Sequence, residues 1–118
     1  KLVRTIRGLA IHGRAIIVGR AGVEITRSLK YGLHLKLVAP LSYRIQKIME
    51  LNNIRDRLEA EKMVEKKDRE RHDFLTQYVK FDARNAAMYD ITFNVARITP
   101  EEISQSVLCV LRSRGFMK

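Results

Sequence analysis

A glycine-rich turn that contains one arginine follows the first long apolar run of the chain. Residues 15–18 are apolar without interruption, and Gly19-Arg20-Ala21-Gly22 comes directly after them. Glycines let the backbone approach a ligand closely, and a guanidinium can hold a phosphate through two hydrogen bonds. In open parallel sheets, ligands bind at the carboxyl ends of the strands, where this turn would lie. The turn is therefore a candidate phosphate site, and a plain strand-to-helix connection is the alternative.

A second candidate is the charged run Lys66-Lys67-Asp68-Arg69-Glu70-Arg71. On a helix, Lys67 and Arg71 are four residues apart and share one face. Arginines on a helix that closes over a transferring phosphoryl group stabilise its negative charge. The alternative is a solvated helix held by ion pairs such as Lys66 with Glu70.

Other kinds of chemistry find little support in the chain. His12, His34 and His72 lie far apart and do not have the spacing of metal ligands, so we expect no metal site. Cys109 lies in an apolar helical stretch, which predicts a core residue. The sequence contains neither a serine nucleophile elbow nor a G-x-x-x-x-G-K-[ST] phosphate loop. Acyl transfer is therefore not indicated.

The composition fits one globular domain of 118 residues with a net charge of +10. Residues 1–50 carry ten lysines and arginines against Glu24 and Glu50, so this block holds +8 of the excess. Such a block favours an anionic partner over a uniformly basic surface. A single cysteine excludes a disulfide framework, and no apolar run reaches the roughly 18 residues of a membrane span. We therefore predict a cytoplasmic protein with no membrane partner.

The pattern of apolar residues predicts alternating helices and strands. Residues 15–18 are apolar throughout, as in a strand buried on both faces, whereas 33–39 alternate, as in a strand with one open face. Thr99-Pro100-Glu101-Glu102 is a strong helix start. The predicted helices cover 2–13, 23–29, 43–51, 57–78 and 99–115, and the predicted strands cover 15–18, 33–39 and 89–95.

This order predicts an α/β fold in which helices pack on a parallel sheet. Three strands are few for such a sheet. Because the chain also opens on Lys1 inside a helical pattern, we expect further strands from an upstream part or from a partner chain. Unpaired sheet edges favour association, so a homo-oligomer is a further expectation.

Five motifs occur in an order that resembles the cytidylate kinase-like family, from about residue 4 to about residue 111. They are Thr5-Ile6-Arg7-Gly8-Leu9-Ala10, Ala15-Ile16-Ile17-Val18-Gly19-Arg20, Leu37-Val38-Ala39-Pro40-Leu41-Ser42-Tyr43-Arg44-Ile45, Asp68-Arg69-Glu70-Arg71, and Tyr89-Asp90-Ile91-Thr92-Phe93-Asn94 before Thr99. The resemblance is to the C-terminal part of that family.

The resemblance implies a P-loop-kinase-like, three-layer α/β fold with a parallel sheet, incomplete at its N-terminus, and a long charged lid helix. Residues 1–118 would form one domain, the C-terminal portion of a cytidylate kinase-like domain, with the lid at about 55–80. The implied activity is transfer of the γ-phosphoryl group of Mg-ATP to CMP or a similar nucleotide. ATP and Mg would then be needed by the intact protein.

The same resemblance assigns roles to individual residues. Gly19 and Arg20 match the turn that contacts the acceptor nucleotide, and Asp68 matches the lid acid that touches it. Arg44 matches a basic position on the helix after the second strand. Arg71 matches the lid arginine that contacts phosphates, and Arg69 is a second catalytic candidate.

Two departures from the family pattern bear on activity. Ala21 stands where cytidylate kinases proper have an acidic residue, and the ATP-binding loop with its lysine is absent from these residues. Phosphoryl transfer depends on positioning and charge neutralisation. This chain alone is therefore predicted not to transfer phosphate.

Three functions remain open on the sequence. The first is the C-terminal part of a nucleoside monophosphate kinase-like enzyme. The second is a non-catalytic nucleotide-binding or regulatory domain. The third is a basic nucleic-acid-binding module, which ranks last because the chain lacks dense aromatic or helix-turn-helix signatures.

Overall fold

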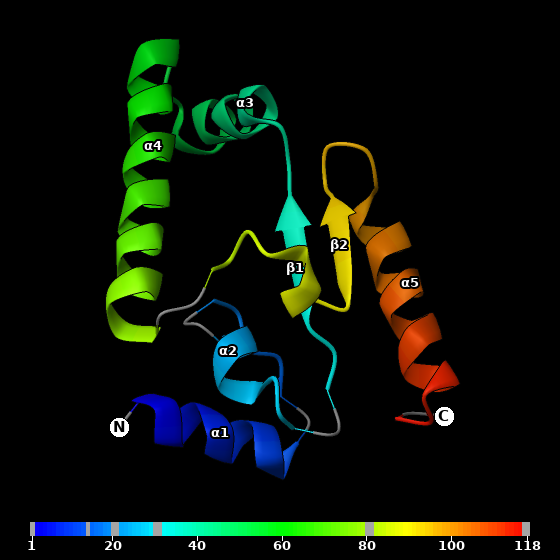
Figure 1. The fold of residues 1–118 in the computed structure, drawn as a ribbon. Helices are drawn as coiled ribbons and strands as arrows, with labels where there is room; N and C mark the ends of the chain where they lie inside the picture. Colours follow the sequence, from blue (N-terminus) through cyan, green and yellow to red (C-terminus); the bar gives the residue numbers. More distant parts are fainter. Residues whose placement is uncertain (1, 14, 20–21, 30–31, 80–81, 117–118) are drawn as a thin grey trace.

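The computed structural model describes residues 2–13, 15–19, 22–29, 32–79 and 82–116. Helices α1 (Leu2–His12) and α2 (Gly22–Thr26) come first, then strand β1 (Leu35–Val38), helix α3 (Leu41–Asn52) and helix α4 (Arg57–Phe74) (Figure 1). A π-helical turn η1 (Leu75–Val79) continues α4, and a 3₁₀ turn η2 (Ala86–Met88) precedes strand β2 (Ile91–Asn94) and helix α5 (Pro100–Ser113).

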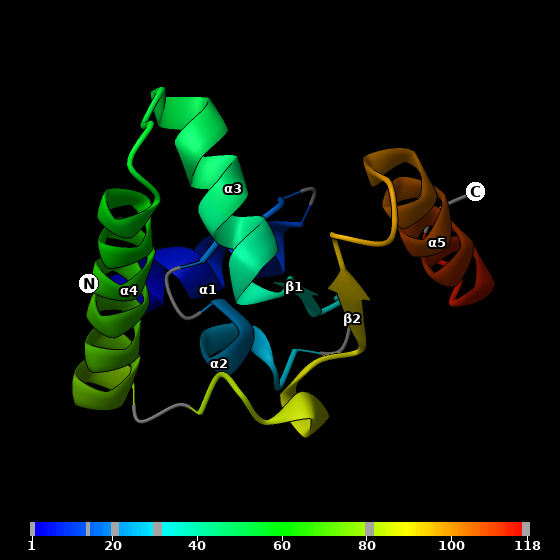
Figure 2. The same ribbon diagram turned by 90° about the horizontal axis from the view of Figure 1, so that it is seen from above.

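The two strands form a parallel pair, as the sequence predicts. Leu35 lies opposite Ile91, and Val38 lies opposite Asn94. Helices α3 and α4 both fall within the connection between the strands, and in both ribbon views α5 and α4 lie on opposite sides of the pair (Figures 1 and 2). The mixed helices and parallel strands confirm the α/β class. The three-layer kinase-like arrangement stays a prediction.

The predicted strand over 15–18 is wrong. This segment forms no strand, and the side chains of Ile16 and Val18 are 94% and 85% exposed. A strand needs a hydrogen-bonded neighbour, and none of the described residues provides one for this segment. Ile17 alone packs inward, against the side chains of the first apolar cluster defined below.

The alternating burial expected for the strand over 33–39 is also not found. Leu35 and Lys36 are half-buried, whereas Leu37 and Val38 are both exposed. Burial therefore changes along the strand instead of alternating between its faces. Lys36 is covered because the loop that precedes β2 lies against it.

Apolar side chains of the described residues form two separate clusters. The α1–α2 cluster joins Ile6, Ile25 and the η1 residue Leu75. The α3–α4 cluster joins Ile45, Ala60 and Val64, with Ile48, Met49 and Ile54 packed around it. Helix α4 is therefore held at both ends, by α3 near its start and by α1 and α2 just beyond its end.

Local signals in the sequence are confirmed at several element ends. Gly13 follows α1 with φ +85, a left-handed conformation that glycine adopts without a steric penalty. Thr99 caps α5 and forms the full capping box with Glu102, and Pro100 is the first helical residue. The expected burial of Cys109 is wrong, because this residue is exposed on α5. A helix has only one inward face, so a run that is apolar all round must expose part of itself.

The capping box of α5 gives a pH dependence. The Thr99 amide donates to Glu102 Oε1 at 3.0 Å, and this bond holds the pKa of Glu102 below its ordinary 4.5. The stabilisation is fully present above that value and disappears as the pH falls through the lower pKa of the folded chain. Urea unfolding should show wild type more stable than Glu102→Gln at pH 6, with the difference shrinking as the pH is lowered below 4.5. A difference that persists in acid would contradict this prediction.

Within the part of the chain that the structure describes, no helix combines the length and the apolar character needed to cross a membrane.

Candidate functional site

A tight contact between α3 and α4 positions the charged residues of both helices. The Ala60 side chain is fully buried and lies with Ile45 and Val64, so the two helices approach closely at a small residue. Asn53 ends α3 in the left-handed conformation, with φ 53. Asp56 then begins α4 by accepting a hydrogen bond from the Leu58 amide at 3.0 Å. The turn between the helices is therefore closed at both ends.

Arg44, Asp68 and Arg71 come together at this contact. Arg44 Nη2 of α3 donates to Asp68 Oδ1 of α4, and the two side chains form an ion pair. Arg71 Nη1, one turn further along α4, lies 3.4 Å from the same oxygen. Three of the residues that the sequence assigns to the site therefore form one cluster. We call it the Arg44–Asp68–Arg71 cluster.

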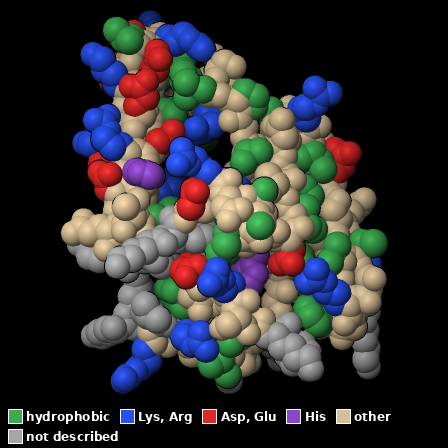
Figure 3. Space-filling model, viewed as in Figure 1, with side chains coloured by type: hydrophobic (Ala, Val, Ile, Leu, Met, Phe, Trp, Pro, Cys, Tyr) green, Lys and Arg blue, Asp and Glu red, His purple; other side chains and the backbone are tan. Residues whose placement is uncertain are grey.

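The charges of this cluster favour an anionic ligand. Two guanidinium groups share one carboxylate, so the net charge is +1. Each guanidinium has five N–H donors, and Asp68 Oδ1 uses only one from each arginine. Arg71 is 65% exposed, and Arg44 and Asp68 are each more than one-third exposed. A phosphate can therefore reach donors of both arginines. Along α4, basic and acidic side chains are interspersed on this side of the molecule (Figure 3).

The cluster lies where a parallel sheet places its ligands. α3 follows β1 after Ala39 and Pro40, and the Arg44 amide donates to the Pro40 carbonyl at 3.1 Å in its first turn. Arg44 is therefore set at the carboxyl end of β1. Carboxyl strand ends are the usual ligand-binding edge of open α/β sheets.

The glycine turn is described only in part. Gly19 has φ +68, and its carbonyl accepts a hydrogen bond from the Gly22 amide at 3.0 Å. A Cβ on Gly22 would lie 2.9 Å from Ile17 Cγ2, so a larger residue here would force the Ile17 side chain to shift. Arg20 lies outside the described residues. Its assignment to the acceptor site stays a prediction.

The other residues that the sequence analysis named differ in how exposed they are. Arg69 is exposed on α4 and makes none of the contacts of the Arg44–Asp68–Arg71 cluster. His72 is exposed, whereas His34 is half-buried and makes polar contacts. Among the described residues, no group of three His, Cys, Asp or Glu side chains is placed to hold a metal ion.

Lys36 and Tyr89 fasten the loop after α4 onto the sheet. Lys36 Nζ donates to the Ala83 carbonyl at 2.5 Å, and the Tyr89 hydroxyl donates to the same oxygen at 3.0 Å. Lys36 Nζ also lies 5.3 Å from the centroid of the Tyr89 ring. Burial, with a smaller contribution from Asp82, raises the pKa of Tyr89, so its hydroxyl stays a donor at neutral pH. The return from α4 to β2 is thereby fixed on β1.

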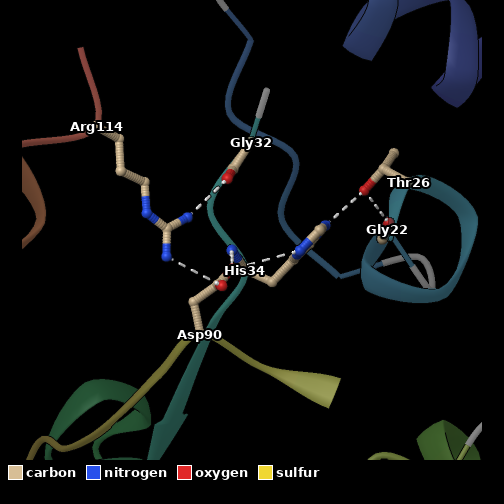
Figure 4. Close-up of polar contacts among 6 residues, drawn as sticks. All are labelled: Gly22, Thr26, Gly32, His34, Asp90 and Arg114. Carbon is tan, nitrogen blue, oxygen red and sulfur yellow. Dashed lines mark hydrogen bonds and ion pairs between the residues drawn. The ribbon is translucent and has the colours of Figure 1, made fainter. Parts of the chain in front are cut away.

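The sequence did not reveal a second polar group, at the amino ends of the strands. Thr26, His34, Asp90 and Arg114 contact one another there (Figure 4). A cavity of about 400 Å³ opens beside them, lined by Arg27, Ser28, His34, Ala87, Met88, Tyr89 and Asp90. His34 and Asp90 each precede a strand by one residue. That both residues come one position before a strand is the sequence feature that could have indicated their contact. It is informative only once the register of the two strands is known.

Comparison with known protein families gives a match to most of the chain. The model of the cytidylate kinase-like family matches residues 2–97. No curated protein matches the chain. The matched range includes all three residues of the Arg44–Asp68–Arg71 cluster, and it includes the glycine turn.

Proposed function

The chain belongs to the cytidylate kinase-like family, and on that premise we propose that it forms the acceptor-nucleotide side of an enzyme that transfers a phosphoryl group from ATP to CMP or a similar nucleotide. The observation that carries this proposal is the convergence of Arg44 and Arg71 on Asp68 at the carboxyl end of β1. Arg44 comes from α3, whereas Asp68 and Arg71 come from α4. Asp68 follows Arg44 by 24 positions in the sequence. A surface helix held by ion pairs alone needs no partner on α3.

The roles in this proposal follow from the contacts. Arg44 and Arg71 bind the phosphate of the acceptor through the N–H groups that Asp68 does not use. Asp68 holds the two guanidiniums at one spacing and accepts from the nucleotide with its second oxygen. Gly19 and Arg20 also contact the acceptor nucleotide in this proposal, a role that comes from the family resemblance alone.

Helix α4 acts as the lid in this proposal, within a segment of about residues 55–80. Its first turns pack on α3 through Ala60 and Val64, and its end is followed by Leu75, which is buried in the α1–α2 cluster. The charged stretch between these anchors is exposed. Arg69 lies on this stretch and is the second catalytic candidate in this proposal.

Binding of ATP and Mg requires residues other than these 118. The 118 residues contain no G-x-x-x-x-G-K-[ST] loop, and the only carboxylate in the cluster already pairs with two arginines. The donor set is therefore unsuited to a resident Mg ion. We therefore place residues 1–118 as the C-terminal portion of the catalytic domain, inactive by itself.

Calorimetric titration of the chain with nucleotides tests this function. CMP should bind, and cytidine should bind much more weakly, because it lacks the phosphate that the arginines contact. UMP and AMP, titrated in the same way, rank the base preference. The chain alone should show no CMP-stimulated ATP turnover, whereas a polypeptide of the same gene that joins a phosphate loop to it should. Equal affinities for CMP and cytidine, or no stimulated turnover in the longer polypeptide, would refute the proposal.

A further inference from the structure

The two carboxylate oxygens of Asp68 are used differently. Oδ1 accepts from Nη2 of Arg44, and Nη1 of Arg71 lies 3.4 Å from the same oxygen. Oδ2 accepts no hydrogen bond from any of the described residues. The Asp68 side chain is 38% exposed, so solvent and solutes reach it. An N–H or O–H group of a ligand can therefore bind Oδ2 while both arginines keep their contact with Oδ1.

Asp68 also sets the charge of the Arg44–Asp68–Arg71 cluster. Within the described ranges, Arg44 and Arg71 form ion pairs with Asp68 alone. The cluster carries +1 with this carboxylate and would carry +2 without its charge. An anion that approaches the two guanidiniums also approaches the carboxylate, and the two negative charges repel each other. Because all three side chains are partly exposed, water and salt keep this repulsion modest.

A bare phosphate ion and a nucleoside monophosphate differ in what they offer to Oδ2 of Asp68. Both bring phosphate oxygens that accept from guanidinium N–H groups. The nucleotide also carries neutral donors that are separate from its phosphate, namely the ribose hydroxyls and, in cytosine, the amino group. A hydrogen bond from such a donor to a carboxylate offsets the repulsion of the phosphate. The same side chain therefore opposes one ligand and helps to bind the other.

We infer that Asp68 is a specificity-determining residue, which makes the Arg44–Asp68–Arg71 cluster select a nucleoside monophosphate over inorganic phosphate. Its charge weakens the binding of a bare anion, and its Oδ2 accepts a hydrogen bond from the nucleoside part of the ligand. Binding sites commonly gain specificity by placing an unfavourable charge against the wrong ligand. The selection of a nucleotide rests on the proposed function, whereas the exclusion of bare anions rests only on the contacts of the cluster.

Asp68→Asn removes the charge and keeps the shape of the side chain. The amide oxygen of asparagine can accept from Arg44 and Arg71 as Oδ1 does, and its NH₂ group replaces the acceptor Oδ2 with a donor. Glu70→Gln is the matched control, because it removes one negative charge from α4 two residues further on. A helix turns by about 100° per residue, so Glu70 lies on a different face, and it is exposed. It makes none of the contacts of the cluster.

Calorimetric titration of the whole chain with inorganic phosphate and with CMP tests the inference, at about pH 8 and about 0.15 M ionic strength. Wild type should bind CMP more tightly than inorganic phosphate. Asp68→Asn should bind inorganic phosphate about three- to tenfold more tightly than wild type, because one repelling charge is gone. It should bind CMP no more tightly, because the lost acceptor offsets the gain in charge. The ratio of the two dissociation constants, phosphate over CMP, should therefore fall at least about threefold, and Glu70→Gln should keep the wild-type ratio.

The possible failures of this experiment point to different conclusions. Equal tightening of phosphate and CMP in Asp68→Asn, or no tightening of phosphate, would overturn the inference, provided that the circular dichroism spectrum matches wild type. Equal affinities of wild type for CMP and inorganic phosphate would overturn it without any variant. Both results leave the proposed function in place if CMP still binds more tightly than cytidine. Tighter phosphate binding by Asp68→Asn, with no CMP binding by wild type, would refute the proposed function and leave the exclusion of bare anions established.

Discussion

Replacing Phe93 with alanine is expected to remove about 3–5 kcal/mol from the free energy of unfolding. Phe93 lies on β2 with 6% of its surface exposed, and it is the bulkiest of the buried apolar side chains that the structure describes. Small domains are stable by only about 5–15 kcal/mol in total. A loss of this size is a large fraction of that total, so the midpoint of urea unfolding should fall markedly. Urea unfolding followed by circular dichroism measures the change.

The register of the sheet supplies a matched control for Phe93. Leu37 lies directly opposite on β1, yet it is 61% exposed. Leu37→Ala removes a large apolar side chain from the same pair of residues but leaves no buried cavity. Its cost should stay below about 1 kcal/mol. Equal costs for the two variants would mean that β2 is not the packed strand of the pair.

Local structure was predictable where the determinants lie within a few residues. The capping box at Thr99 and Glu102 depends on side chains three positions apart, and both of its hydrogen bonds are formed. The inward face of α3, with Ile45 buried, follows from helical periodicity alone. Such features depend little on the rest of the fold, so the sequence is sufficient to find them.

Features that depend on pairing were not predictable in the same way. Residues 15–18 have the composition of a buried strand, but burial requires neighbours on both sides that these residues do not supply. Cys109 is apolar among apolar neighbours, and only the rotation of α5 against the sheet decides that it is exposed. His34 and Asp90 are 56 positions apart and meet through the register of two strands. Each of these outcomes is set by tertiary structure.

The candidate site was predictable in part: its residues could be named from the sequence, but their contacts could not. Resemblance singled out Arg44, Asp68 and Arg71 separately, with no indication that they touch. The pairing of Arg44 with Asp68 arises because Ala60 lets α3 and α4 pack closely. Arg69, adjacent to Asp68 in sequence, is turned away by the helical rotation of about 100° per residue. Helix geometry therefore separates two arginines that the motif treats together.

Replacing Arg44 with methionine is expected to weaken CMP binding by about ten- to a hundredfold. The guanidinium supplies hydrogen bonds to a charged phosphate, and such bonds are worth about 1.5–3 kcal/mol. Methionine keeps much of the apolar stem, so the packing of α3 on α4 through Ile45 should persist. The ion pair with Asp68 is more than one-third exposed, so its loss should change the unfolding free energy by at most about 1 kcal/mol. Calorimetric titration with CMP gives the affinity, and urea unfolding gives the stability.

The matched control is Arg57→Met, which removes the same charge from the neighbouring helix α4. Arg57 begins α4 and lies eleven residues, or about 16 Å, before Asp68 along the helix axis. If general positive charge attracts the nucleotide, the two variants should weaken binding alike, and both effects should shrink in salt. If the Arg44–Asp68–Arg71 cluster contacts the phosphate, only Arg44→Met should lose affinity, and its affinity for cytidine should equal that of wild type. The phosphate-specific loss separates a built site from a basic surface, because a net charge of +10 alone attracts any anion.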